Sequence, residues 1–151
     1  MKLSWSPDIQ RPSPAVILIL LNREKKMTIV IVDDHVNVRR LLHEWLKDEL
    51  PGCSFVEMRT AREALAYCSS EAPLAVIMDI DMPGMNGIDA TMRLKTMSPD
   101  IKVVILTVHE NGVYKEEAMK AGANAFITKR RLYDDLVPVL SDIVECQESI
   151  S

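Results

Sequence analysis

The chain has 151 residues, which is the length of one domain and enough to bury a sizeable hydrophobic core. Hydrophobic residues make up 48% of it and charged residues 26%, which is ordinary for a globular protein. The net charge of −4 gives no support to a nucleic-acid-binding surface, because a domain that holds phosphates by charge is more often basic.

Neither the cysteines nor the apolar runs indicate export or a membrane span. Cys53, Cys68 and Cys146 are odd in number and lack metal-ligand spacing, so we interpret them as core or surface residues in a reducing compartment. The longest apolar stretch, residues 15–21, is far shorter than the roughly 20 residues that a membrane-spanning helix needs. A charged segment follows it where a signal peptide would have a small-residue cleavage site. We therefore expect a cytoplasmic protein without a membrane span.

The N-terminal segment differs from the rest of the chain. Prolines and polar residues lead into the short apolar run and then into the charged patch. We expect residues 1–26 to form a poorly ordered extension that holds at most one added strand, at residues 16–20. Met27 opens the regular pattern, and mass spectrometry of the native protein would test the hypothesis that it is the natural start. The folded domain is expected to span residues 27–148.

From Thr28 onward, apolar strand patterns alternate with amphipathic helix patterns. The first helix, for example, has an apolar stripe at helical spacing that is made of Val38, Leu41, Leu42, Trp45 and Leu46. We expect strands at residues 28–32, 54–58 (an edge strand), 74–78, 101–107 and 123–128. We expect helices at residues 36–50, 60–69, 87–97, 111–121 and 132–146.

Turn and capping residues mark several helix ends. Pro51-Gly52 ends the first helix, and Thr60 with Glu63 forms a capping box at the start of the second. Gly122 is expected to cap the carboxyl end of the fourth helix. Pro138 lies early in the last helix, where a proline can distort the first turns.

Strands that alternate with helices imply a parallel sheet covered by helices on both faces, which is an α/β fold. Right-handed crossovers and a chain of this size favour the flavodoxin-like (βα)5 three-layer sandwich, with strand order 2-1-3-4-5. Ligands bind such sheets at the carboxyl ends of the strands, beside the point where the strand order reverses. We therefore expect the ends of the first and third strands to flank a binding crevice.

Polar residues that can do chemistry stand at the ends of four predicted strands. Asp33-Asp34 follows the first strand and Asp79 follows the third, while Thr107 ends the fourth and Lys129 follows the fifth. These residues are far apart in the sequence, yet the predicted fold would gather them around one crevice.

The acidic residues of this set suit a metal ion. Asp79 ends a buried strand, and a turn signalled at residues 83–87 follows at once. Asp33, Asp34 and Asp79 would repel one another, and each would resist ionising unless a cation lay among them. An all-oxygen site open to water suits a hard divalent cation, Mg²⁺ first. With a hydroxyl and an ammonium nearby, the set is suited to phosphoryl transfer, and a carboxylate can itself become an aspartyl phosphate.

Each of these residues has a simpler explanation when it is taken alone. Asp33 and Asp34 can form a solvated turn that caps the next helix, and Thr107 can be an ordinary β-branched strand residue. Lys129 belongs to a charged run, which is usually a solvated face. The histidines can be surface residues without a role: His35, His43 and His109. Their joint placement at four strand ends is much harder to obtain by chance, which favours the functional interpretation.

The stretches that carry these residues resemble the motifs of a known family. From Met27 to about Cys146, the chain is similar to the response-regulator receiver domain, the phosphoacceptor half of two-component signalling. The resemblance rests on motifs in matching order and spacing, at residues 29–35 (IVIVDDH), 78–87 (MDIDMPGMNG), 104–107 (VILT) and 121–129 (AGANAFITK). The Asp-Asp-His and Leu-Thr-Val-His segments resemble the NarL/FixJ-like subclass.

The resemblance implies a role for each residue of the acidic set. Asp79 would be the phosphorylated residue. Asp34 and Asp79 would give carboxylate oxygens to Mg²⁺, Asp81 would give its backbone carbonyl, and Asp33 would act mainly through water. Lys129 would pair with Asp79 and then with the phosphate.

The resemblance also implies a conformational switch. Thr107 would hydrogen-bond the phosphoryl group, and Phe126 would be the aromatic residue whose rotamer follows Thr107. The surface formed by the fourth helix, the fifth strand and the fifth helix would then change, and it would bind a downstream protein or form a homodimer. The phosphoryl donor would be the phosphohistidine of a cognate histidine kinase, or a small phosphodonor. Such a domain is a signalling phosphoacceptor rather than an enzyme with a separate substrate.

Some positions depart from the family pattern. Many receivers have a proline in a cis bond after the lysine, whereas Arg130 stands here, and a cis bond would then cost about 3 kcal/mol, so we expect trans. Phe126 lacks the hydroxyl of the common tyrosine. Asp81 and His109 occupy positions that in the family tune dephosphorylation by controlling the attacking water.

The resembling subclass usually continues into a helix-turn-helix DNA-binding domain, whereas this chain ends at Ser151. We therefore expect either a stand-alone receiver or a truncated product of a longer gene. We expect no DNA binding by this chain, which a sequence-selective, salt-resistant shift with duplex DNA would contradict.

The sequence leaves two other functions open. Residues 79–82 have the Asp-x-Asp form of haloacid-dehalogenase-like phosphatases, although their nucleophile typically follows the first core strand. The other alternative is a receiver fold that binds partners without phosphate, although all five expected positions are present.

Overall fold

The computed structural model describes residues 11–17 and 27–150, and the second range folds around a parallel sheet. The strands of this described range are β1 (Met27–Val32), β2 (Cys53–Met58), β3 (Ala75–Met78), β4 (Lys102–Thr107) and β5 (Ala125–Thr128). Their order is β2-β1-β3-β4-β5 and each neighbouring pair is parallel, which confirms the predicted flavodoxin-like topology. β2 lies at an edge of the sheet, as its weaker apolar alternation predicted.

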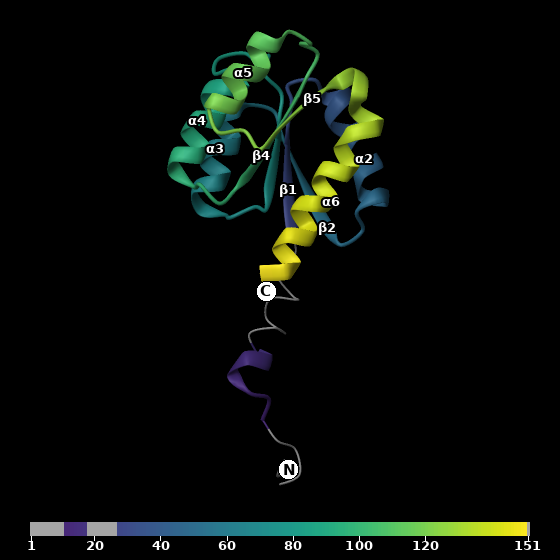
Figure 1. Ribbon diagram of the computed structural model, residues 1–151, viewed down its shortest axis with the longest axis vertical. Coiled ribbons are helices and arrows are strands. Elements are labelled where there is room, and N and C mark those ends of the chain that lie inside the picture. Colours follow the sequence, from purple (N-terminus) through teal and green to yellow (C-terminus); the bar gives the residue numbers. More distant parts are fainter. Residues whose placement is uncertain (1–10, 18–26, 151) are drawn as a thin grey trace.

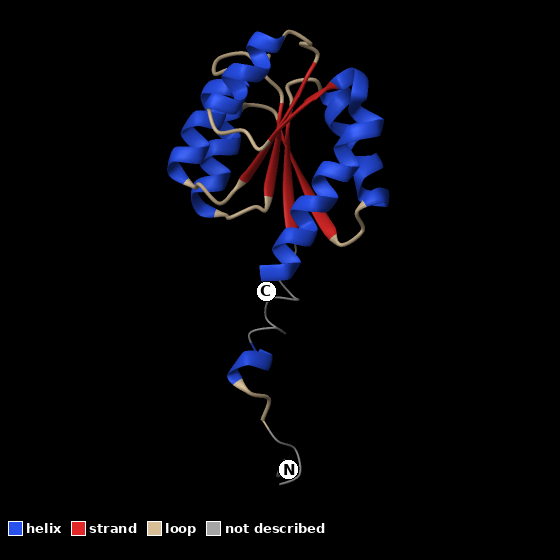
Figure 2. Ribbon diagram, viewed as in Figure 1, coloured by secondary structure: helices blue, strands red, loops and turns tan. Residues whose placement is uncertain are grey.

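Helices cover both faces of the sheet. They are α2 (Val36–Glu49), α3 (Ala61–Ser70), α4 (Gly87–Met97), α5 (Gly112–Lys120) and α6 (Leu132–Ile150), with a 3₁₀ turn, η1 (Lys129–Arg131), before α6. In Figures 1 and 2, α3, α4 and α5 lie on one side of the sheet, whereas α2 and α6 lie on the other. The central strands are therefore shielded from water on both sides.

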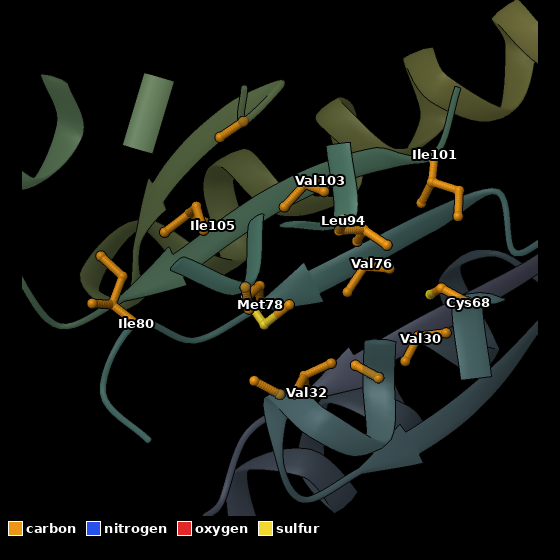
Figure 3. Packing of buried hydrophobic residues seen from close by; sticks show 14 of the residues in the cluster. Val30, Val32, Cys68, Val76, Met78, Ile80, Leu94, Ile101, Val103 and Ile105 are labelled. Carbon is orange, nitrogen blue, oxygen red and sulfur yellow. The ribbon is translucent and has the colours of Figure 1, made fainter. Parts of the chain in front are cut away.

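Alternate side chains of each central strand enter opposite layers of the core. In β1, Val30 and Val32 pack toward α3, α4 and α5, while Ile29 and Ile31 pack toward α2 and α6. Figure 3 shows Val30 beside Val76 of β3 in the first of these layers. None of the four β1 side chains is more than 1% exposed. This burial explains why the strands are continuous apolar runs rather than alternating ones.

The predicted helix caps are present, with small differences. The Thr60 hydroxyl accepts the N–H of Glu63 at 3.2 Å. In a regular capping box the Glu63 carboxylate would accept the N–H of Thr60 itself. Here it accepts the N–H of the preceding residue, Arg59, at 3.2 Å. Gly122 lies two residues after the end of α5 and has a φ of +105°, and its N–H and that of the next residue donate to α5 carbonyls.

Two details of the helices differ from the prediction. α6 runs through Pro138 as one helix and extends to Ile150. The proline costs the helix one N–H donor, but Leu136 and Leu140 on either side of it are fully buried, and their packing holds the helix together. Leu41 is 48% exposed, although it belongs to the predicted apolar stripe of α2. It lies at the flank of the stripe, whose centre is formed by the buried Leu42 and Leu46.

The N-terminal prediction is partly wrong. Residues 14–17 form a helical turn in which the N–H of Ile17 donates to the carbonyl of Ser13 at 3.0 Å. A turn satisfies its hydrogen bonds locally, whereas an added strand would have to pair with a sheet edge. The expected strand is therefore absent at residues 16–17, and residues 18–20 lie outside the described residues.

Residues 11–17 and 27–150 lack both a membrane-spanning helix and a cis peptide bond. They contain no helix with the length and apolar character that crossing a membrane would require. They also contain no cis peptide bond, so the bond between Lys129 and Arg130 is trans, as predicted.

Candidate functional site

The carboxyl ends of β1 and β3 bring the acidic residues together. The N–H of Asp79 donates to the carbonyl of Val32 at 3.0 Å, and the N–H of Asp33 donates to the carbonyl of Met58 at 3.2 Å. These bonds extend the pairing of β1 with its two neighbouring strands by one residue. The backbones of Asp33 and Asp79 therefore lie side by side at the end of the sheet. Asp33 is only 2% exposed and Asp79 only 4%, whereas the neighbouring Asp34 is partly exposed.

The cluster has the composition of a divalent-cation site. Carboxylate oxygens of Asp33, Asp34 and Asp79 and a ring nitrogen of His35 all lie within 4.8 Å of one another. Asp34 Oδ1 is buried without a hydrogen-bond partner among the described residues, although His35 Nδ1 is 3.2 Å away. A buried carboxylate oxygen without a donor is costly, and coordination of a cation would compensate it. The residues present therefore fit Mg²⁺.

His35 was not predicted as a member of this cluster. Its N–H donates to Asp33 Oδ1 at 2.9 Å, and its Nδ1 lies 3.1 Å from the same oxygen. The sequence signal was its position directly after the acid pair, because an Asx-type turn folds the residue two positions on back over the aspartate.

Lys129 supplies the positive charge of the site. It follows β5 directly, and its Nζ lies 3.0 Å from Asp33 Oδ2 and 3.6 Å from Asp79 Oδ2. The predicted pairing with Asp79 is therefore present, but the shorter contact is to Asp33. Burial raises the pKa of Asp79 to about 6. The Lys129 charge opposes this effect, and the charges of Asp33 and Asp81 add to it.

Thr107 ends β4, the strand next to β3, and is fully buried. Its Oγ1 accepts the backbone N–H of His109 at 3.2 Å. Since a hydroxyl has one donor proton and two acceptor lone pairs, this bond leaves the proton of Thr107 for another partner.

A side-chain bridge joins the loops that follow β3 and β4. His109 Nε2 lies 2.6 Å from Asp81 Oδ2, and the His109 ring stacks on Tyr114 with centroids 4.1 Å apart. The sequence singled out Asp81 and His109 separately, but not their contact. The bridge uses Asp81 Oδ2 and leaves the backbone carbonyl of Asp81 free for the predicted ligand role.

Phe126 lies in β5 and is partly buried against the apolar layer on the α3–α5 side. The register pairs Phe126 with Ile105 and pairs Thr128 with Thr107. Phe126 is thus two positions before the residue opposite Thr107. Its role as a switch stays a prediction.

Gly87 sets how closely α4 approaches the acidic cluster. A Cβ at this position would lie 2.0 Å from the backbone oxygen of Asp79, so only glycine fits. The N–H of Gly87 donates to the carbonyl of Ile80 at 2.9 Å, and Asn86 caps the helix by accepting the N–H groups of Ile88 and Asp89. The predicted turn residue is therefore also a packing requirement of the site.

A family comparison matches the region that holds this site. The family model described as response regulator receiver domain matches residues 29–141. This range includes the acidic cluster, Thr107 and Lys129.

Individual proteins show the same similarity. The chain is 33% identical over 124 residues to response regulator GacA of Pseudomonas aeruginosa, which covers 82% of this chain and 58% of the relative. It is 29% identical over 126 residues to response regulator UvrY of Escherichia coli, which covers 83% and 57%. The chain thus spans little more than half the length of these curated relatives. Response regulator protein TrrA of Thermotoga maritima, solved in complex with Mg²⁺-BeF, has a TM-score of 0.69 and 28% identity, over 77% of this chain and 97% of that chain.

Removing the charge of Asp79 should stabilise the fold when no metal is present. The pKa of Asp79 is raised from 3.8 to about 6, so the neutral carboxyl stabilises the fold below pH 3.8 and this contribution is lost as the pH rises through 6. Asp79→Asn should therefore raise the free energy of unfolding at pH 8 by about 1–3 kcal/mol, allowing for solvent screening. The gain should fall to about half at pH 5, as measured by urea denaturation in EDTA.

The exposed carboxyl of Asp142 on α6 offers a matched control for this series. Asp142→Asn should change the free energy of unfolding little at either pH. A loss of stability in Asp79→Asn at pH 8, or a gain that does not depend on pH, would contradict the raised pKa of Asp79.

Gly87→Ala should displace the start of α4 from Asp79, because the added methyl would overlap a backbone oxygen. We expect a loss of about 2 kcal/mol or more in the free energy of unfolding, measured by urea denaturation. Gly112→Ala at the start of α5, where nothing lies within 4 Å of the added Cβ, is the control. Equal stability of the two variants would contradict the close packing at Gly87.

Proposed function

The chain belongs to the response regulator receiver domain family, and we propose that it accepts a phosphoryl group on Asp79 and relays the resulting change to a partner protein. The observation that carries this proposal is the cluster of Asp33, Asp34 and Asp79 with Lys129 3.6 Å from the Asp79 carboxylate. We assign the receiver to residues 27–148 and treat residues 1–26 as an extension.

The transfer is a displacement at phosphorus by the Asp79 carboxylate. One Asp79 oxygen forms a P–O bond while the P–N bond of a kinase phosphohistidine breaks, and the bonding electrons return to the imidazole nitrogen. A small phosphodonor would react in the same way at its own P–O bond. The ionised form of Asp79 is the nucleophile, so a pKa of about 6 leaves most molecules competent at neutral pH.

Asp34 and Asp79 would hold Mg²⁺ through carboxylate oxygens, Asp81 through its backbone carbonyl and Asp33 through water. When bound, the ion would neutralise charge on the carboxylates and on the phosphoryl oxygens. Asp34 Oδ1 is buried and has no hydrogen-bond partner among the described residues, which supports this assignment. Asp33 has its own partners in His35 and Lys129, which supports its placement outside direct contact with the ion.

After transfer, Thr107 and Lys129 would donate hydrogen bonds to the phosphoryl oxygens. Lys129 would move from its 3.0 Å contact with Asp33, and Thr107 would use its hydroxyl proton. Phe126, two positions before the residue opposite Thr107, would follow this movement. The surface of α4, β5 and α5 would then shift its population toward the form that binds a partner or a second copy of the chain.

The proposed partners follow from this chemistry. They are a cognate histidine kinase upstream and a protein downstream, in the cytoplasm, and the domain processes only its own phosphoryl group. No contact with DNA or with a membrane enters the proposal.

Incubation with acetyl phosphate and Mg²⁺ tests the function. Mass spectrometry should show a labile phosphoryl adduct on the wild-type chain that is absent in Asp79→Asn and in EDTA. Asp142→Asn, with its carboxyl exposed on α6, should be modified like the wild type. Steady turnover of small phosphate esters would instead indicate a phosphatase, and a wild-type chain without an adduct or a response to beryllofluoride would indicate a phosphate-independent interaction module.

The bridge between His109 and Asp81 should prolong the lifetime of the aspartyl phosphate. The bridge links the loops after β3 and β4, and the stacked Tyr114 holds the imidazole in place. His109→Ala should therefore shorten the phosphoryl half-life several-fold, because water gains access to the phosphorus. Decay of the adduct after removal of the phosphodonor measures this, with Tyr114→Phe, which keeps the stacked ring, as the control. A half-life in His109→Ala equal to or longer than that of the wild type would contradict the proposed shielding.

A further inference from the structure

Arg39 holds the backbone of the acidic pair from behind. It lies in the first turn of α2, its side chain is only 12% exposed, and its Nη1 donates to the backbone carbonyl of Asp33 at 2.6 Å. The pairing register of β1 ends at Val32, so the Asp33 carbonyl lies where the sheet no longer supplies a donor. A buried carbonyl needs a donor, and a guanidinium provides a charge-assisted one.

Arg39 is itself held from β2. Its Nε lies 3.6 Å from Glu57 Oε1, which is an ion pair rather than a hydrogen bond, and this Nε is buried without a hydrogen-bond partner among the described residues. Glu57 Oε2 lies 2.9 Å from His43 Nδ1 on the same helix as Arg39. Glu57 pairs in register with Ile31 of β1. The guanidinium therefore links α2, the edge strand and the junction from which the acidic pair projects.

The Asp33 side chain is fixed independently of this contact. Its Oδ1 accepts the N–H of His35 at 2.9 Å, and its Oδ2 accepts Lys129 Nζ at 3.0 Å. Asp33 is thus held at its carboxylate and at its carbonyl. The next residue, Asp34, has a buried Oδ1 without a hydrogen-bond partner in the described part of the chain. The orientation of that oxygen depends on the peptide unit that Arg39 holds.

We infer that Arg39 is a positioning residue for the cation site, because it fixes the peptide unit from which Asp34 presents its carboxylate. The inference rests on the proposed function, since it takes the Asp34 and Asp79 carboxylates as the ligands. The sequence carries no signal for this role, because the partner of Arg39 is a backbone carbonyl.

The sign of the effect separates positioning from simple electrostatics. A guanidinium beside a cation site repels the cation, so loss of its charge alone should raise the metal affinity. Loss of positioning should lower it, because partners that orient metal ligands typically contribute about tenfold or more to affinity.

The experiment measures Mn²⁺ affinity by electron paramagnetic resonance of the free ion, with Mg²⁺ as the competitor. Arg39→Gln should weaken Mn²⁺ binding about tenfold. Arg39→Lys, which keeps the charge but lacks the several N–H donors of the planar guanidinium, should also weaken it. Glu57→Gln, which keeps Arg39 but loosens its support, should have a smaller effect in the same direction. Arg40→Gln, at the exposed arginine next to it on α2, is the matched control and should bind as tightly as the wild type or more tightly.

Circular dichroism and urea denaturation establish that each variant is folded before the titration. Unchanged or tighter Mn²⁺ binding by folded Arg39→Gln would overturn the inference, and Arg39→Lys, which keeps the charge, decides it if Arg39→Gln does not fold. A wild-type chain that binds no Mn²⁺, or one whose affinity is unaffected by Asp34→Asn, would instead overturn the proposed cation site. The two failures are therefore distinguishable.

Discussion

The repulsion among Asp33, Asp34 and Asp79 is the constraint on which the rest of the site depends. Their oxygens, together with a ring nitrogen of His35, lie within 4.8 Å of one another, and two of the residues are almost fully buried. Lys129 compensates part of this charge, and the pKa of Asp79 still rises to about 6. The fold therefore maintains an arrangement of like charges that a bound cation would stabilise.

Backbone pairing, close packing and a hydrogen bond from outside the acidic cluster hold this arrangement in place. Parallel pairing of β1 and β3 places Asp33 next to Asp79, and the absence of a side chain at Gly87 lets α4 begin against the Asp79 backbone. Arg39 holds the Asp33 carbonyl at 2.6 Å. Other groups of the site lie nearer the surface: Lys129, the exposed Asp81 and His109, which bridges to it.

The sequence predicted the features that follow from periodicity and from strand ends. Continuous apolar runs determine the buried strands, and a parallel sheet necessarily gathers the residues after them, so Asp33, Asp79 and Lys129 could be placed together. Contacts that depend on loop conformation could not be predicted. Asp81 and His109 are separated by 28 residues, and their bridge requires both loops to close over the same edge. The role of Arg39 was hidden for the same reason, since its partner is a backbone carbonyl that has no sequence signal.

We propose that charge compensation at Asp79 couples metal binding to the ionisation of this carboxylate. Carbon-detected nuclear magnetic resonance of the Asp79 side-chain carboxyl, titrated with pH in EDTA and in saturating Mg²⁺, tests it directly. We expect the Asp79 carboxyl to have a pKa of about 6 without the metal and a clearly lower pKa with it, because the cation favours the ionised form. Identical titration curves in the two conditions would show that metal binding and the ionisation of Asp79 are not coupled.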